Sequence, residues 1–465
     1  MEAEMDEEEG YPLSPADDWI ENKIRRINAA ADAHTHGGPN ESLKISKPPK
    51  ALLDVRPLSY RPQLMTIGPL HDMLSDSASA DRCKELCVWR FMQRHGIPDV
   101  KQLMQRIFED PRSFLDTHYS NPLDYNSLEI LQLMLTLDTI LIYEFFLYMC
   151  ATVSESTIEQ YGHFQTLWKN DIIGKQFFRD LFLMGNQIPM SFLKRIAAFP
   201  NENEVNLKDL QAVLVDIVVR SCPFPMGYND WHKNVGNPNL LNCEHLLDCQ
   251  YVLVTQGLHE HKRSPQIQHN GSRNLIGAGR LQSRHRDRLP TASQLSKVGI
   301  SFHAHKNGTS LIKYHRRTLQ LHLPRIVVYE GTENVLRNLL AYEQTSKEGC
   351  EFAKYVVIMD SLIYTTEDLA ILMKAGVIVN HLGSDQKLAN MWNNMCENVT
   401  IRSCGRWDKM TCEVLHDYEN PWRRMYVEFH EKFFSRPWLT TSVIDAILIL
   451  ILTLLQTIYT ILGYY

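Results

Sequence analysis

Three histidines near an Asn-Gly pair form the most compact group of side chains that could do chemistry. His303 and His305 alternate along one face of a predicted strand, and His315 follows the turn. Three imidazoles could hold a zinc ion if a fourth ligand joined them, but no cysteine is adjacent in the sequence. A metal-stabilised hairpin is therefore a minor alternative. We interpret the three as exposed polar residues of a strand and expect neither a metal site nor a bound cofactor.

Two carboxylates, Asp138 and Glu144, lie within a strongly apolar stretch. Because they are six residues apart, a helix would not place them on one face, as an acid–base pair would require. We expect each of them to cap or pair with a neighbouring element. His245 and Asp248 are further isolated candidates, and an enzyme would need a deep pocket in which such groups converge.

The chain lacks the sequence motifs of the common enzyme classes. It has no GxxxxGK[ST] or GxGxxG phosphate loop, no GxSxG elbow, no HExxH pair, no EF-hand loop and no kinase signature. Any hydrolytic centre would have to be assembled from isolated residues. We therefore expect no catalytic residues, no small-molecule substrate and a protein that is not an enzyme.

Residues 437–465 are predicted to form a single transmembrane anchor. Between Val443 and Leu462 the sequence is apolar except for one Asp, a few Thr and one Gln. A helix of about 20 residues rises roughly 30 Å, which matches the hydrocarbon core of a bilayer. Four basic residues precede this stretch and none follows it, so the bulk of the chain is expected to face the cytosol. A buried core helix is the alternative.

The composition is that of a globular protein. The 465 residues are 44% hydrophobic and 22% charged, with room for one large domain or two to three ordinary ones. A formal charge of −6 gives no general attraction to nucleic acid. Ten cysteines without a repeated spacing predict reduced thiols in a cytosolic setting. The acidic N-terminal run differs from a signal peptide.

The chain divides into a tail, a domain and the anchor. Residues 1–50 are predicted to be a disordered acidic and polar tail. Residues 51–436 form the domain, which contains a flexible basic insert at 257–290 and a hairpin at 298–315 with an Asn-Gly turn. Residues 321–328, apolar with one Pro, are predicted to be an edge strand. The fold class is mainly α: a large helical domain with a small β-hairpin or sheet element, followed by one C-terminal transmembrane helix.

The basic insert, residues 257–290, is the one segment with a charge that could attract a partner. Each basic residue near an anionic surface contributes about 1 kcal/mol, so acidic headgroups or an acidic protein are candidate contacts. A solvated loop is an equal alternative. No aromatic side chains are interleaved for base stacking, so nucleic acid is not expected.

Several local signals predict helix ends. Thr365 with acidic residues after it begins a helix, which Gly376 ends. Ser384 is the expected cap of the next helix, and Pro189 separates two earlier ones. We expect these residues, and Gly299 and Gly383, to set backbone geometry rather than to bind a ligand.

A set of short motifs follows in a fixed order from about Tyr60 to the C-terminus. They are Ile67-Gly68-Pro69-Leu70-His71, Asn186-Gln187-Ile188-Pro189, His245-Leu246-Leu247-Asp248, Ala292-Ser293-Gln294-Leu295 with Gly299, Leu336-Arg337-Asn338-Leu339-Leu340-Ala341-Tyr342-Glu343-Gln344, Met359-Asp360-Ser361-Leu362-Ile363, Asn380-His381-Leu382-Gly383-Ser384-Asp385 and Pro437-Trp438. Each motif alone is weak, but the ordered set is specific.

On these motifs the chain resembles the plant proteins classed as domain of unknown function 247. It differs from the usual pattern in having Gly185 in place of Glu and Leu70 in place of a frequent Tyr, which is typical of a divergent member. The resemblance implies a mostly helical domain with a small β element and a single C-terminal span, and it implies no established reaction. Some grass members are linked to self-incompatibility as pollen-side recognition components.

We therefore expect a membrane-anchored, non-enzymatic plant protein that acts in protein–protein recognition or signalling, in a self-incompatibility-like role or another, with an unidentified protein partner. The alternative is a membrane-tethered enzyme of unrecognised type. Single-pass localisation is expected, with the plasma membrane and an endomembrane both open. Recognition residues should lie on exposed stretches such as the basic insert. Five polar motif residues are expected to satisfy buried backbone groups: Asn186, Gln187, Asn338, Gln344 and Asp360.

Overall fold

The structure is a computed structural model of the 465-residue chain. It describes residues 44–71, 78–108, 117–120, 128–154, 164, 171–199, 207–225, 242–259, 288–305, 312–346, 351–400, 405–434 and 437–463. Backbone contacts divide the chain into two compact units, Met1–Leu43 and Lys44–Tyr465. All of the described residues belong to the second unit.

The domain begins earlier than the sequence predicts. Ile45 forms a β-bridge with Tyr119, and its N–H donates a 2.7 Å hydrogen bond to the carbonyl of His118. The Ile45 side chain is 3% exposed, so it belongs to the core. Residues 44–50 of the predicted tail are thus part of the domain, because one buried Ile anchors them. The rest of the predicted tail lies outside the described residues.

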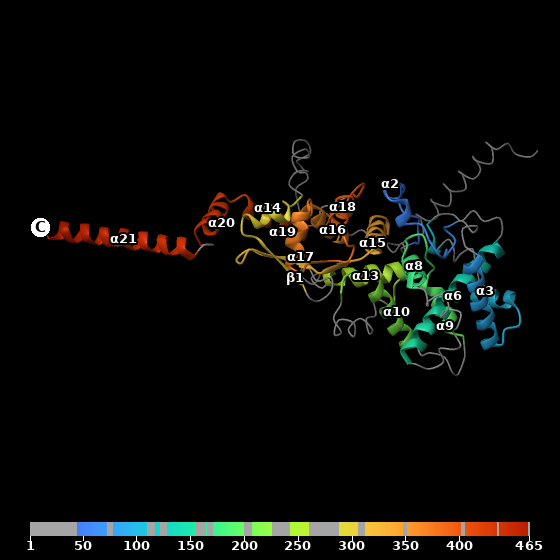
Figure 1. Cartoon of the computed structure of the whole chain (residues 1–465). Helices are drawn as coiled ribbons and strands as arrows, with labels where there is room; N and C mark the ends of the chain where they lie inside the picture. The colour runs from blue at the N-terminus through green and yellow to red at the C-terminus, as the bar shows by residue number, and fades with distance from the viewer. Residues whose placement is uncertain are drawn as a thin grey trace, which may run out of the picture. The chain divides into compact units, whose positions relative to one another are not determined.

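The first half of the domain is built from helices around α6 (Figure 1). The long helix α6 contacts α3, α4, α9 and α10, so it forms the centre of this half. Its composition explains the position, since every residue from 138 to 149 is buried and all but Asp138, Thr139 and Glu144 are apolar. The elements are α2 (Lys50–Val55), η1 (Pro57–Ser59), α3 (Ala78–His95), α4 (Val100–Ile107), α6 (Leu128–Ser154), α8 (Asp171–Leu181), α9 (Met190–Ala197) and α10 (Leu207–Ser221).

The second half combines helices with two small sheets. Its helices are α13 (Leu246–His259), α14 (Ala292–Ser296), α15 (Thr332–Ser346), α16 (Glu351–Leu362), α17 (Thr366–Lys374), α18 (Asp385–Asn393) and α19 (Gly405–Tyr418). Its strands are β1 (Ser301–His305), β2 (Lys313–His315), β3 (Gln320–Pro324), β4 (Ile326–Val328) and β5 (Ile378–Asn380). The mainly helical fold with a small sheet element confirms the predicted fold class.

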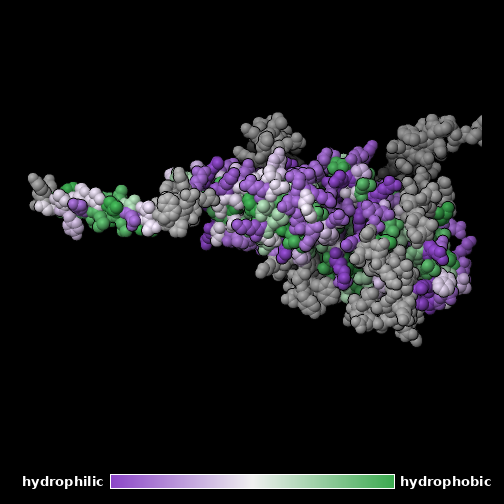
Figure 2. Space-filling model, in the orientation of Figure 1, coloured by the Kyte–Doolittle hydropathy of each residue, from purple (hydrophilic) through white to green (hydrophobic). Residues whose placement is uncertain are grey.

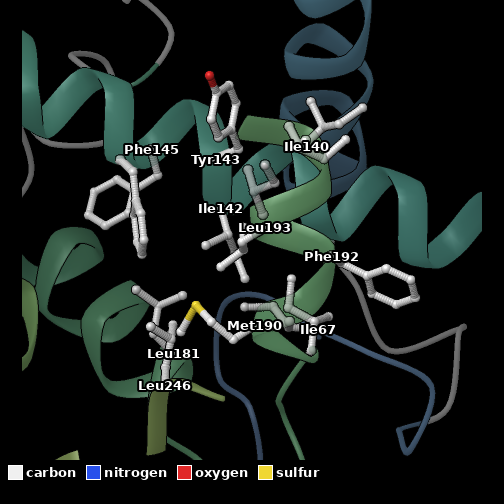
Figure 3. Close-up of a cluster of buried hydrophobic side chains, with 14 of the residues drawn as sticks. Ile67, Ile140, Ile142, Tyr143, Phe145, Leu181, Met190, Phe192, Leu193 and Leu246 are labelled. Carbon is white, nitrogen blue, oxygen red and sulfur yellow. The ribbon is translucent and has the colours of Figure 1, made fainter. Parts of the chain in front are cut away.

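Helix α13 contributes side chains to two separate hydrophobic cores. The first core contains side chains of α3, α4, α6, α8, α9 and α10, and Figure 3 shows Ile142 of α6 near Leu193 of α9, and Leu246 of α13 near Leu181 of α8. The second contains those of α14–α19 and both sheets. From α13 the first core receives Leu246, Cys249 and Leu253, and the second receives Leu247, Tyr251 and Val254. A helix apolar on opposite faces is expected between two layers.

The predicted hairpin at 298–315 is wrong in its pairing. Strands β1 and β2 do not bond to each other, because β3 lies between them in the order β1-β3-β2. β3 is parallel to β1 and antiparallel to β2, so the chain does reverse, while the Asn-Gly pair itself lies outside the described residues. Of the predicted edge strand 321–328, the part in β3 is therefore central, whereas β4 pairs with β5 alone in a two-stranded sheet. The buried Leu321 and Leu323 of β3, both 0% exposed, favour the position with a neighbour on each side.

Two described helices are long and apolar enough to cross a membrane. In α6 the apolar stretch is Leu128–Cys150, and 72% of its most apolar window is buried. The other is Ile444–Leu462 in α21 (Pro437–Leu462), of which none is buried. Figure 2 shows hydrophobic residues over the surface of this C-terminal helix. Helix α20 (Pro421–Phe434) precedes it.

Candidate functional site: the junction of the motifs

The loop between α8 and α9 is the point at which the separate motifs meet. The side chain of Asn186 accepts a 2.6 Å hydrogen bond from the N–H of Ile67 and donates to the carbonyl of Met65. Gln187 accepts from the N–H of Leu247 at 3.1 Å and donates to two carbonyls at the end of α8. Three motifs far apart in the sequence are thus joined through two amide side chains. Both are buried, with 1% and 2% exposed.

Gly68 lies against this loop in a conformation that favours glycine. Its φ is +74°, and a Cβ at this position would lie 2.4 Å from the carbonyl oxygen of Gln187. The N–H of Gly68 donates a 2.8 Å hydrogen bond to Asp138 of α6. Only a residue without a side chain permits this approach, which explains the Gly in the first motif.

Asp180, at the end of α8, holds the segment that leads into the first motif. Its carboxylate accepts hydrogen bonds from the N–H groups of Gln63, Leu64 and Met65, and it pairs with Arg179 at 2.8 Å. Burial raises the pKa of Asp180, while these amides and the guanidinium lower it. No sequence motif indicated this residue. The local sequence offers only an Asp directly after an Arg, which does not indicate this role.

A second group of buried polar residues joins α13 to α15 and α16. The Tyr342 hydroxyl donates a 2.7 Å hydrogen bond to Asp248, and the Tyr251 hydroxyl donates a 2.8 Å bond to Glu343. Glu343 also accepts from the N–H groups of Phe352 and Ala353, so it caps the first turn of α16. Burial raises the pKa of both tyrosines and of Glu343.

Most of the polar motif residues satisfy backbone groups, as predicted. Asn338 accepts from the N–H of Met184 at 2.9 Å and donates to the carbonyl of Ser59. Gln344 accepts from the N–H of Thr400. Asp360 differs, because its described partners are the side chains of Arg288, 3.5 Å away, and Cys396, and burial raises its pKa. The prediction of buried backbone partners is confirmed for Asn186, Gln187 and Asn338. It is wrong for Gln344, which bonds to an exposed backbone group, and for Asp360, which bonds to side chains.

The predicted helix caps are confirmed. Thr365 caps α17 in a capping box with Asp368, whose carboxylate also accepts a 2.8 Å bond from the N–H of Ser293. Gly376 has a φ of +73° just after α17. Ser384 caps α18 by accepting from the N–H of Lys387. The bond from Ser293 to Asp368 thus joins the Ala292–Leu295 motif to the start of α17.

The residues proposed for an unrecognised enzyme each bond to other groups of the domain. Asp138 pairs with Lys84 of α3 at 2.9 Å, and Glu144 forms an ion pair with Arg94 of the same helix. Each carboxylate therefore pairs with a neighbouring element, as the sequence predicts. His245 accepts a 3.2 Å bond from the N–H of Asp248 at the start of α13.

An apolar groove among the described residues contains none of these four groups in its lining. Its lining comes from Val298, Gly299 and Leu319 on one side and from α20 on the other. Its single charged residue is Arg423, and its other ionisable side chain is that of Tyr426. The groove could accept an apolar group.

The predicted group of histidines has a fourth member, His322, which the Asn-Gly pattern does not indicate. The ring of His322 on β3 lies 5.2 Å from His303, 5.3 Å from His305 and 4.9 Å from His315, measured between ring centroids. The register explains this, since His303 is directly opposite His322. Among the described residues, no three His, Cys, Asp or Glu side chains are arranged to hold a metal ion. The four rings are a histidine cluster on the polar face of the sheet.

Fold and site together define a mainly helical protein with a small sheet and an apolar C-terminal helix, in which sequence motifs are joined through buried hydrogen bonds. Residues 45–452 match the model of the family described as "Plant protein of unknown function", DUF247. The chain belongs to this family, and the resemblance on the ordered motifs is confirmed.

Two curated relatives are similar along almost their whole length. A putative UPF0481 protein of Arabidopsis thaliana is 24% identical, with 94% of this chain and 93% of that protein covered. A second UPF0481 protein of Arabidopsis thaliana is 22% identical, with 91% and 87% covered. No solved structure matches the chain.

Proposed function

We propose that this protein is a membrane-anchored recognition protein without enzymatic activity. Helix α21 crosses the membrane once, and the domain presents its surface to protein partners in the cytosol. The proposal rests on one observation above all: the most apolar window of Ile444–Leu462 has no buried residue, whereas that of the somewhat less apolar stretch in α6 is mostly buried. An exposed apolar helix of this length needs a bilayer or a partner to cover it.

The polar residues of the motif junction support recognition rather than catalysis. Asn186, Gln187 and Asn338 use their amides on backbone groups, and Asp138 and Glu144 form ion pairs with α3. A general acid or base needs a position facing a substrate, and these groups are occupied within the fold. The basic insert 257–290 lies largely outside the described residues and remains the proposed contact for an acidic partner.

Protease protection of an N-terminally tagged chain in sealed vesicles tests the proposal. With the cytosolic face outward, protease should remove the tag and the domain, leaving a fragment close to α21 that resists extraction by alkaline carbonate. A tag that is protected, with sugar on the asparagines, would reverse the orientation. Complete extraction by carbonate would contradict the span itself. Deleting residues 260–287 should weaken capture of a protein partner, and unchanged capture would exclude the insert.

A further inference from the structure

Helix α20 carries an exposed apolar stripe directly before α21. Trp422, Met425, Tyr426 and Phe429 follow the spacing i, i+3, i+4 and i+7, so they share one helix face. Their exposed fractions are 72%, 54%, 68% and 47%. Four large side chains exposed in one row on a 14-residue helix indicate a surface that another phase or molecule covers.

The orientation of α20 is fixed by residues outside the stripe. Arg423 forms a 3.2 Å ion pair with Asp417, which is 1% exposed at the end of α19. Val427 packs on Gly299, where an added Cβ would lie 3.1 Å from Cγ2 of Val427. These contacts hold the helix to the domain while the stripe stays exposed. The apolar groove runs between the stripe and Leu319.

The distance along the chain places α20 at the depth of the lipid headgroups. α20 ends at Phe434, and the apolar stretch of α21 begins at Ile444. The first seven residues of α21 rise about 10 Å, close to the thickness of one interfacial layer of a bilayer. Contacts between α20 and α21 keep the two helices near each other.

We propose that α20 lies in the membrane interface, with Trp422, Met425, Tyr426 and Phe429 inserted between headgroups and acyl chains. Aromatic side chains favour this boundary, and basic residues beside them favour anionic lipid. Arg424 is exposed on α20, where it forms an exposed 3.3 Å pair with Glu428, and Lys432 and Arg436 follow in the sequence. The inference rests on the proposed span of α21, because that span brings α20 to the membrane.

Quenching of Trp422 by brominated lipid tests this inference in the full-length protein. The chain is reconstituted into vesicles of phosphatidylcholine and phosphatidylserine, with bromine near the carbonyl end of the acyl chains. The difference in emission between the unaltered chain and the variant Trp422→Phe gives the contribution of Trp422 alone. We expect this emission to be quenched in brominated vesicles. Trp89→Phe is the matched control: Trp89 is 58% exposed on α3, far from α20 in the sequence, and its emission should be unquenched.

The failure of this inference is distinguishable from the failure of the span. If the chain resists carbonate extraction but the Trp422 emission is unquenched, the span holds and α20 is not in the interface. Cross-linking between copies through Met425→Cys in that case identifies a second copy as the occupant. If carbonate extracts the chain and Trp422 is still quenched before extraction, α20 binds lipid although the span fails. Tyr426→Glu should reduce the quenching of Trp422 and leave carbonate resistance unchanged.

Discussion

The hydroxyl of Tyr342 donates a 2.7 Å hydrogen bond to Asp248, a residue 94 positions earlier in the chain. One turn further along α13, Tyr251 donates to Glu343, the neighbour of Tyr342. The two rings meet edge to face with centroids 5.5 Å apart. Each helix therefore supplies one tyrosine donor and one carboxylate acceptor, and this reciprocal pair joins the helix between the two cores to the second half of the domain.

The first prediction is that Tyr342→Phe destabilises the domain by about 2 kcal/mol, the usual contribution of a hydrogen bond to a charged acceptor. The hydroxyl stays protonated because burial and Asp248 raise its pKa. Denaturant unfolding measures the loss. A double-mutant cycle with Tyr251→Phe should show coupling, since the two rings are in contact. Strict additivity would contradict a shared network.

The second prediction concerns two glycines that both have positive φ. Gly68→Ala should destabilise the domain by about 3 kcal/mol, because the strain of a positive φ adds to a clash with the carbonyl of Gln187. Gly96→Ala is the matched control, since its φ is +59° and no atom lies within 4 Å of an added Cβ; about 1 kcal/mol is expected. Equal losses in thermal unfolding would show that the contact between Gly68 and Gln187 is unimportant.

The third prediction is that Asp180→Ala costs about 3 kcal/mol. It removes the acceptor of three backbone N–H groups that precede the first motif. Asp216→Asn serves as the control, because Asp216 forms an exposed i,i+4 pair with Arg220 that contributes about 0.5 kcal/mol or less. Hydrogen exchange should show lost protection at residues 63–65 in the first variant. Retained protection there would contradict the role of Asp180 as the acceptor that holds this segment.

These contacts separate what the sequence could predict from what it could not. The caps at Thr365, Ser384 and Gly376 were predictable because the interacting groups lie within four residues of one another. The partner of Tyr342 was not, since nothing local relates it to Asp248. The pairing of β1 with β3 was missed for the same reason, because an Asn-Gly pair predicts a chain reversal but not which strand fills the space between.

The fourth prediction is a loss of stability as pH falls below about 6.5, the ordinary pKa of histidine. Burial, followed by the charges of His305, His315, His303 and Lys313, lowers the pKa of His322. Between that lowered pKa and about 6.5 the unfolded chain binds more protons at this residue, so acid favours unfolding. His322→Gln should reduce the slope of stability against pH in this window. His381→Gln, an exposed histidine outside the cluster, should leave it unchanged.

The fifth prediction tests which of the two apolar helices crosses the membrane by placing an arginine in each. Leu454→Arg lies near the middle of the stretch in α21 and is 56% exposed, so it should leave the domain folded. Arginine at the centre of a span costs about 3 kcal/mol for insertion, and the fraction of protein resistant to carbonate should fall.

Leu141→Arg is the counterpart in α6, where the side chain is 0% exposed in the first core. A buried unpaired guanidinium should unfold the domain, so the variant should lose its cooperative transition and become sensitive to protease. Membrane retention in this variant should persist, because α21 is intact. If Leu141→Arg instead released a folded chain from the membrane, α6 would be the helix that holds the protein there. That result would contradict the proposal that α21 is the membrane span and α6 a core helix.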